Sequence, residues 1–380
     1  MNKLVAKAIA SFFKKEKRSH IRQMLYHFSI LKFVQSVYYV LKILICCPRD
    51  RGIVIEANPF HTECLYSVLS YLKAEKEIIV FGDKEALSLG ILDRCVDFPK
   101  PKSFFITPVS LWMLDKLHFL NHCRFVFANS YLIWWAQTSV ESFLNNYLKT
   151  GKNLLVIDHA PGKWTPVSSS RPNVHQFVLA DFLSKIYPHP PLYACVFPQE
   201  KQKQKKFLFL SVGVACDPKR RDMDSFLVWL KEHSDCQSCI ITRDLSDKRI
   251  HEKIISLPNN TLLFSPPFSV MFDYISQSVF MPFLIHGDNL GYYQTSISGN
   301  MNLALGLGII PIIDKRLARL YGFTEKEAII YNGQSELFNA LNQATLLSEQ
   351  QIKQMRRALL VLRKKCIQRS FSNISSFLCS

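Results

Sequence analysis

The chain has 380 residues, of which 48% are hydrophobic and 20% are charged, so it is not a disordered chain and is expected to form one large or two ordinary domains. Its eleven cysteines are scattered; they predict neither a disulfide scaffold nor a zinc site, and a reducing cytoplasm fits them best. Of the formal net charge of +17, residues 1–51 carry +9 and residues 350–380 carry +7. Charge on apolar terminal segments favours an anionic membrane surface over a nucleic-acid groove.

Residues 1–50 predict basic amphipathic helices that associate with a membrane. Apolar side chains recur at helical spacing over residues 4–13, with lysines beside them. A second apolar run, residues 29–47, contains Lys32 and Lys42. Because a lysine near the centre of a spanning helix costs about 2.5–3.5 kcal/mol on insertion scales, this run is expected to lie in the membrane interface or to pack on the body of the protein.

Residues 51–200 predict a first α/β domain. Strands are expected at 52–56, 78–81, 104–106, 125–128 and 154–157, with helices at 62–73 and 131–148; this alternation is typical of a parallel sheet. His61 follows the first of these strands and His159 follows the last. Open α/β sheets bind ligands at the carboxyl ends of their strands. The two histidines are therefore the candidate catalytic residues, as a general base on a hydroxyl group or as a ligand for it.

Residues 187–191 and 198–206, with their prolines and a lysine-rich run, predict a linker, after which the alternation restarts. Residues 201–345 predict a second α/β domain, which is expected to face the first across a cleft. Its strands are expected at 207–212, 239–242, 261–264, 279–284, 309–313 and 328–331. Residues 346–380 predict a basic C-terminal helix.

The second domain contains a candidate anion-binding site. Lys219, Arg220 and Arg221 follow the strand at 207–212, and three adjacent cations are costly to hold together without an anion. The segment Ser298-Gly299-Asn300 opens a short helix, whose N–H groups and positive dipole end suit a phosphate. Both features are expected at one edge of one sheet, where they would hold the two phosphates of a nucleoside diphosphate.

The loop before this helix supplies further candidates. Asp288 and Tyr293 are expected to bind a ribose hydroxyl or to stack on a ring, and Ser296 adds a hydroxyl group near the phosphates. The chain contains neither GxxxxGK[ST] nor a GxGxxG after a strand, which argues against a P-loop NTPase and a dinucleotide dehydrogenase. No metal motif is evident, so we expect no metal and no cofactor beyond a nucleotide-sugar co-substrate.

These segments resemble the GT-B glycosyltransferases. Lys219–Arg221 and the stretch from Asp288 to Asp314 look like the nucleotide-sugar half of that family, and Ile55–Glu63 is similar to its acceptor-side strand and loop. The resemblance implies two Rossmann-like domains facing a cleft. It also implies a bacterial enzyme that moves a sugar from a nucleotide-activated donor to a glycan or lipid-linked glycan, in surface polysaccharide or lipopolysaccharide synthesis. Such an enzyme would be cytoplasmic and peripheral on the inner face of the cytoplasmic membrane.

Several alternatives stay open at this point. Many retaining members carry a Glu-x7-Glu motif, whereas here Asp288 would replace the first acid and Ser296 or Ser298 stands near the second; the stereochemical outcome is therefore undecided. A CDP-polyol or CDP-glycerol phosphotransferase would use the same two-domain plan. A membrane-associated adaptor without catalytic activity is a different class, and a nucleic-acid binder is the weakest alternative.

Overall fold

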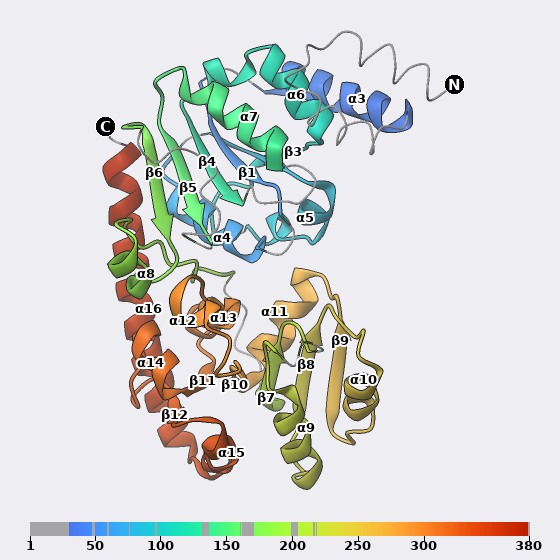
Figure 1. Cartoon of the computed structure of the whole chain (residues 1–380), viewed down its shortest axis with the longest axis vertical. Coiled ribbons are helices and arrows are strands. Elements are labelled where there is room, and N and C mark those ends of the chain that lie inside the picture. The colour runs from blue at the N-terminus through green and yellow to red at the C-terminus, as the bar shows by residue number, and fades with distance from the viewer. Residues whose placement is uncertain are drawn as a thin grey trace. The chain divides into compact units, whose positions relative to one another are not determined.

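The computed structural model describes residues 30–378, apart from 48–49, 59–60, 76, 96, 131–136, 160, 162–170, 199–203, 216 and 218. The amphipathic segment predicted at residues 4–13 lies outside the described residues. The chain forms two compact units (Figure 1). Unit 1 contains the described residues up to Leu92, with 98–157 and 164–177, and unit 2 contains 93–97, 158–163 and the described residues from Val178 onward.

Unit 1 is built on a six-stranded sheet with the strand order β3-β2-β1-β4-β5-β6. Its strands are β1 (Gly52–Glu56), β2 (Ile78–Gly82), β3 (Lys102–Phe105), β4 (Phe125–Ser130), β5 (Leu154–Asp158) and β6 (Val174–Val178). Its helices are α3 (Ile30–Cys46), α4 (Glu63–Tyr71), α5 (Lys84–Ser88), α6 (Pro108–Lys116) and α7 (Gln137–Leu148), with short 3-10 turns at Leu92–Arg94 and Phe119–His122. The central strands β1, β4 and β5 are buried along their whole length, because helices cover both faces of a parallel sheet.

Unit 2 repeats this plan with the strand order β12-β11-β10-β7-β8-β9. Its strands are β7 (Phe207–Val212), β8 (Ser238–Thr242), β9 (Asn260–Phe264), β10 (Ser278–Pro282), β11 (Ile310–Asp314) and β12 (Ile329–Tyr331). Its helices are α8 (Asp181–Ile186), α9 (Met223–Glu232), α10 (Lys248–Ile255), α11 (Phe268–Ser276), α12 (Gly291–Gln294), α13 (Gly299–Leu307), α14 (Lys315–Tyr321), α15 (Leu337–Leu346) and α16 (Glu349–Leu378), with a 3-10 turn at Gln334–Glu336. Both sheets are parallel and doubly wound, which confirms the predicted α/β class.

The helix α3 packs on unit 1 along one stripe only. Ser36, Val40, Ile43 and Cys47 are buried at helical spacing, and the Ser36 hydroxyl lies 2.7 Å from that of Thr107 at the start of α6. The opposite stripe is apolar and exposed: Val34 is 58% exposed, Tyr38 58%, Leu41 52% and Ile45 82%. Within the described residues, no helix is both long enough and apolar enough to cross a bilayer. The run at 29–47 therefore packs on the body through one face and leaves a second apolar face uncovered by described residues.

One strand was missed. The strand β6 was not predicted, because His175 and Gln176 interrupt its apolar character; an edge position tolerates such residues. Residues 192–197, which join the two stretches expected as a linker, are packed, since Leu192, Ala194 and Cys195 are fully buried. Cys195 and Phe197 lie against Gly306 of α13, where an added Cβ would come within 2.7 Å of the Cys195 carbonyl oxygen.

Candidate functional site

The richest set of polar side chains in unit 2 lies where β7, β10, β11 and β12 end. Two loops meet there through a short antiparallel bridge between Arg221, after β7, and Ile285, after β10. The N–H of Asp222 donates to the carbonyl of Leu284 at 2.8 Å, and the N–H of His286 donates to the carbonyl of Arg220 at 3.0 Å. These bonds fix which side chains of the basic loop point inward.

Arg221 is the inward cation, with only 8% of the residue exposed. Its Nη1 donates to the carbonyl of Val212 at 2.5 Å, and no carboxylate among the described residues forms an ion pair with it. Burial lowers the pKa of its guanidinium, an effect that the nearby Tyr292 opposes. Gly213 adopts a φ of +118°, and a Cβ there would lie 2.6 Å from Nη2 of Arg221. The turn thus requires a glycine to admit the guanidinium.

The other two cations of the loop point outward. Arg220 is 57% exposed, and its Nε lies 3.0 Å from the Asp217 carboxylate. Lys219 is exposed as well, and its main-chain N–H donates to the same carboxylate at 3.1 Å. Of the three cations that the sequence groups together, therefore, Arg221 alone is buried, and whether Lys219 and Arg220 take part in binding stays a prediction.

The predicted helix start at Ser298 is confirmed, because Ser298 caps α13 by accepting from the N–H of Asn300 at 3.3 Å. Most of its N–H groups are already used: that of Ser298 donates to the Tyr321 hydroxyl at 3.0 Å, and that of Met301 donates to the Ser298 carbonyl at 2.9 Å. Gly299 is exposed, and the side-chain nitrogen Nδ2 of Asn300 is buried with no hydrogen-bond partner among the described residues. An anion at this helix start would therefore meet Gly299 and Asn300.

A cavity of about 330 Å³ opens beside Asp222 and is lined entirely by unit 2. Its lining residues are Asp222, Leu284, Ile285, His286, Gly287, Asp288, Tyr293, Asp314, Arg316, Tyr331, Asn332, Gly333, Gln334 and Leu337. Three carboxylates face one arginine in this set, so the cavity is acidic. One oxygen of Asp222 is buried in it without a hydrogen-bond partner in the described structure. Such an oxygen calls for a donor group on a ligand, such as a hydroxyl.

Arg316 forms one wall of this acidic cavity. Its guanidinium lies over the ring of Tyr293, 4.4 Å from the centroid, and its Nη2 donates to the Gly287 carbonyl at 3.1 Å. Asp314 caps α14 with one carboxylate oxygen and accepts from the N–H of Gly333 with the other. Burial, with the carboxylates of Asp314 and Asp222 nearby, raises the pKa of Tyr331. The charged and aromatic side chains of the cavity thus hold one another in place.

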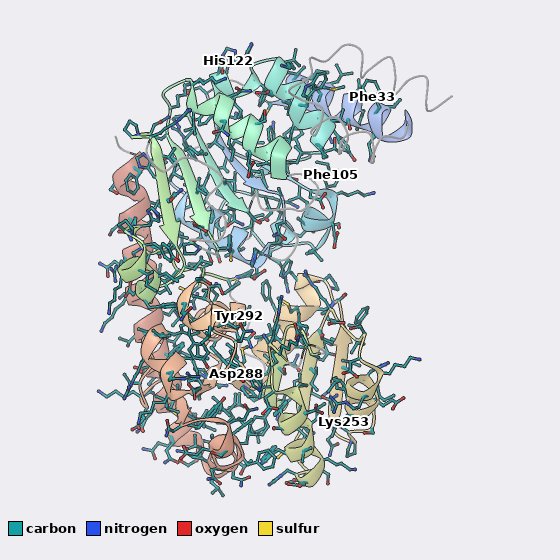
Figure 2. The ribbon with its side chains drawn as sticks, viewed as in Figure 1. Phe33, Phe105, His122, Lys253, Asp288 and Tyr292 are labelled. Carbon is teal, nitrogen blue, oxygen red and sulfur yellow. The ribbon has the colours of Figure 1, made fainter. Side chains whose placement is uncertain are left out.

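The remaining predicted residues of unit 2 have distinct surroundings. Asp288, which is labelled in Figure 2, has a side chain 95% exposed, and its Oδ2 lies 3.6 Å from Nδ1 of His286. Tyr293 lies in the cavity wall, and burial raises its pKa. The hydroxyl of Ser296 donates to the Gly291 carbonyl at 3.1 Å and so helps to close α12. Asp288 and Tyr293 share the acidic cavity, whereas Ser296 is not among its lining residues.

The candidate histidines each follow a strand of the sheet of unit 1, as predicted. His61 is partly buried in the turn between β1 and α4, and its N–H donates to the Asn58 carbonyl at 3.4 Å. His159 directly follows β5, which β4 separates from β1 in the sheet. A catalytic role for either residue stays a prediction. Among the described residues, no group of three or more His, Cys, Asp or Glu side chains could hold a metal ion.

Sequence reasoning missed Asp222, Asp314, Arg316 and Tyr331. The two aspartates each precede a helix and cap it, which is the ordinary role of Asp at such a position. Their positions could have indicated them, because both aspartates also lie at the edge of a parallel sheet where ligands bind.

No known protein family matches the sequence, and no curated protein does. Solved structures do match in fold. The chain is similar to a glycosyltransferase of Rickettsia africae, with a TM-score of 0.51 over 87% of this chain and 98% of that one, at 9% identity. The fold is GT-B. A GT-B chain from Arabidopsis thaliana, UGT89C1 solved with UDP-L-rhamnose, is similar with a TM-score of 0.50 at 10% identity, over 87% of this chain and 98% of that one. At these identities the likeness establishes the fold and not the activity.

Proposed function

We propose that the protein is a glycosyltransferase that binds a nucleotide-activated sugar on unit 2. The sugar would pass to a hydroxyl group of a glycan or a lipid-linked glycan. The single observation that carries the proposal is Arg221, a buried guanidinium without a carboxylate partner among the described residues. Removing an ion from water costs several kcal/mol even after relaxation. A diphosphate is the counter-ion that would offset this cost.

The same position suits the chemistry. When a sugar leaves its nucleotide, negative charge grows on the departing diphosphate, and a cation fixed in place beforehand stabilises that charge. Arg221 is fixed by its bond to Val212 and by the close approach of Gly213. Gly299 and Asn300 would add an N–H and an amide donor at the start of α13. Neither role requires a metal ion.

The acidic cavity would bind the hydroxyl-rich part of the donor. Asp222 follows Arg221 directly, and Ile285, the bridge partner of Arg221, also lines the cavity. A ligand with phosphates at Arg221 and hydroxyl groups at Asp222 matches a nucleotide sugar. A free nucleic acid fits less well, because its phosphates would meet the carboxylates of Asp222 and Asp314.

The exposed stripe of α3 supports a lipid-linked acceptor. An apolar row on α3 is formed by Tyr38, Leu41 and Ile45. Residues 1–51, which include α3, carry a net charge of +9. Apolar burial combined with basic charge is the pattern of proteins that lie on anionic membranes. The enzyme would then work on the cytoplasmic face of the membrane, in the synthesis of a surface polysaccharide or lipopolysaccharide.

A thermal-shift panel of UDP-, GDP-, ADP-, CDP- and dTDP-linked sugars tests the proposal. One nucleotide series should raise the melting temperature, and the matching donor should be turned over in the presence of bacterial lipid-linked glycans. His61→Ala should then lower turnover while donor affinity stays within about twofold. If no nucleotide in the panel binds, the proposed function is wrong. Stabilisation by CDP-glycerol or a CDP-polyol alone would favour the phosphotransferase instead.

A further inference from the structure

A fully buried glutamate closes the first strand of unit 1. Glu56 is the last residue of β1 and has no exposed surface. One of its carboxyl oxygens accepts from the N–H of Asn58 at 3.3 Å, and the other accepts from the side-chain amide of Asn129. A buried carboxyl group in a sheet interior is costly, and the remainder of β1 is apolar.

The backbone of β4 is distorted where it meets this glutamate. Ile55 pairs with Ala128, but Glu56 pairs with Ser130, so Asn129 is an extra residue in β4. Such a bulge re-aims a side chain, and here it goes with an Asn129 amide that reaches the Glu56 carboxylate. A regular ladder would pair Glu56 with Asn129 instead. The bulge therefore places the Asn129 amide that binds the Glu56 carboxyl group.

Glu56 also connects to the turn that carries His61. The carbonyl of Asn58, whose N–H binds Glu56, accepts from the N–H of His61 at 3.4 Å and from the Thr62 hydroxyl at 3.3 Å. Thr62 is fully buried, so the turn is anchored at both ends. A chain of hydrogen bonds thus runs from Asn129 through Glu56 and Asn58 to His61.

We propose that Glu56 is a positioning residue that holds His61 in place. The proposal rests on the proposed function, because it assumes that His61 serves the transferred hydroxyl group. Glu56 does not touch the acceptor, since it is buried. It acts through Asn58, whose main chain sets the start of the turn.

The surroundings of Glu56 disfavour its charged form. Burial raises its pKa well above the usual range, and the hydrogen bonds from Asn129 and Asn58 oppose this only in part. Glu63 of α4 is the titratable group whose charge raises the pKa of Glu56 further, and the charge of Glu56 in turn raises the pKa of the buried Cys64 of α4. Ser130 of β4 lowers the pKa, and from the end of β2 the N–H of Asp83 binds the main-chain oxygen of Glu56. Ionisation as pH rises would bury a charge and loosen the turn.

Two variants of one residue separate positioning from packing. Glu56→Gln keeps the shape and the neutral charge, and the Asn129 amide can rotate to present its oxygen to the new amide. Glu56→Ala leaves the Asn58 N–H and the Asn129 amide without this partner. Asp83→Asn is the matched control, because Asp83 directly follows β2 of this sheet and its capping bond to the N–H of Glu85 survives the change.

The expected result has three parts. Turnover of the donor found in the panel falls at least tenfold in Glu56→Ala, whereas donor affinity changes less than twofold. Glu56→Gln keeps at least half of the activity and loses the decline of turnover with rising pH that the wild type shows. Asp83→Asn follows the wild type throughout. Full activity of Glu56→Ala, or the same decline in Glu56→Gln, would overturn the proposal.

Amide hydrogen exchange makes the test independent of activity. The peptide that contains His61 should exchange faster in Glu56→Ala than in the wild type, while peptides of β5 and unit 2 stay unchanged. If the wild type turns over no donor, the proposed function fails, and the exchange of this peptide still decides whether Glu56 holds the turn. Unchanged exchange there would refute the positioning role. If Glu56→Ala does not fold, the same comparison is made across pH in Glu56→Gln.

Discussion

Replacing Arg221 by methionine should move ligand affinity and stability in opposite directions. Methionine retains much of the apolar stem and removes the charge. A nucleoside diphosphate then loses a desolvated charged partner, a change that typically costs about 2–5 kcal/mol. Since the site is at the edge of the sheet and 8% of Arg221 remains exposed, we take about 2–3 kcal/mol, which corresponds to roughly 30- to 150-fold weaker binding.

The free protein should respond differently. The variant loses the hydrogen bond from Nη1 to the Val212 carbonyl, which is worth about 1.5–3 kcal/mol for a charged donor. It also removes a buried cation whose desolvation costs several kcal/mol. The two effects nearly cancel, so the free energy of unfolding without ligand should stay within about 1 kcal/mol of the wild type or rise.

Calorimetric titration with the nucleoside diphosphate and urea unfolding of the free protein measure the two effects. Arg356→Met is the matched control: burial lowers the pKa of Arg356 too, and its Nη2 donates to the Ser278 carbonyl at 3.1 Å, at the opposite end of β10. The control should bind nucleotide within twofold of the wild type. If Arg221→Met binds within threefold of the wild type and the free protein is destabilised by more than about 2 kcal/mol, then Arg221 is a structural cation and the donor site lies elsewhere.

Three further outcomes are expected. If the acidic cavity receives the donor sugar, UDP-glucose should bind at least tenfold more tightly than UDP-glucuronate. Asp222→Asn keeps the cap to Ser225 and should reduce this ratio of the two affinities. Equal affinities in the wild type would place the sugar outside the cavity. Serine at Tyr38, Leu41 and Ile45 together should weaken co-sedimentation with vesicles rich in phosphatidylglycerol, whereas serine at the exposed Ile255 and Phe264 of unit 2 should not; undiminished binding of the α3 variant would reject the stripe as the docking face. Because burial raises the pKa of Glu56, its contribution to stability should be complete below the unfolded-state pKa of about 4.3 and be lost as pH rises through the folded-state pKa. Urea midpoints should therefore fall less in Glu56→Gln as pH rises above about 4.3, and parallel curves would contradict this.

The central strands could be predicted from the sequence because burial on both faces leaves a readable signal. Residues 52–56 and 207–212 are short apolar runs ended by turn residues, and the structure places β1 and β7 at these limits. Edge strand β6 and the short helices α5, α6 and α14 carried no comparable signal. Their ends are set by capping and by contacts with distant segments, as the Thr107–Ser110 capping box of α6 illustrates.

The candidate site could be predicted only to the level of a segment. Three adjacent cations locate the basic loop, but nothing local says which one turns inward. That choice depends on the bridge between Arg221 and Ile285, residues 64 positions apart in the chain. The hydroxyl-rich segment 295–300 was expected to offer free N–H groups, yet Tyr321 and Ser298 itself already accept from two of them. Long-range partners of this kind are not visible in a local pattern.

Each unit buries an ionisable group at or beside the end of its first strand, and the two groups differ in their hydrogen-bond partners. Glu56 at the end of β1 has hydrogen bonds from Asn58 and Asn129 and can become neutral by keeping a proton. Arg221, beside the end of β7, has one carbonyl and remains a cation near neutral pH, because an arginine pKa starts above about 12. The glutamate can thus be satisfied within its own unit, which suits a residue that fixes a turn. An anion would satisfy the arginine, as the proposed role in binding and stabilising a leaving diphosphate requires. A ligand should therefore stabilise unit 2 through Arg221, whereas Glu56 should make the stability of unit 1 depend on pH.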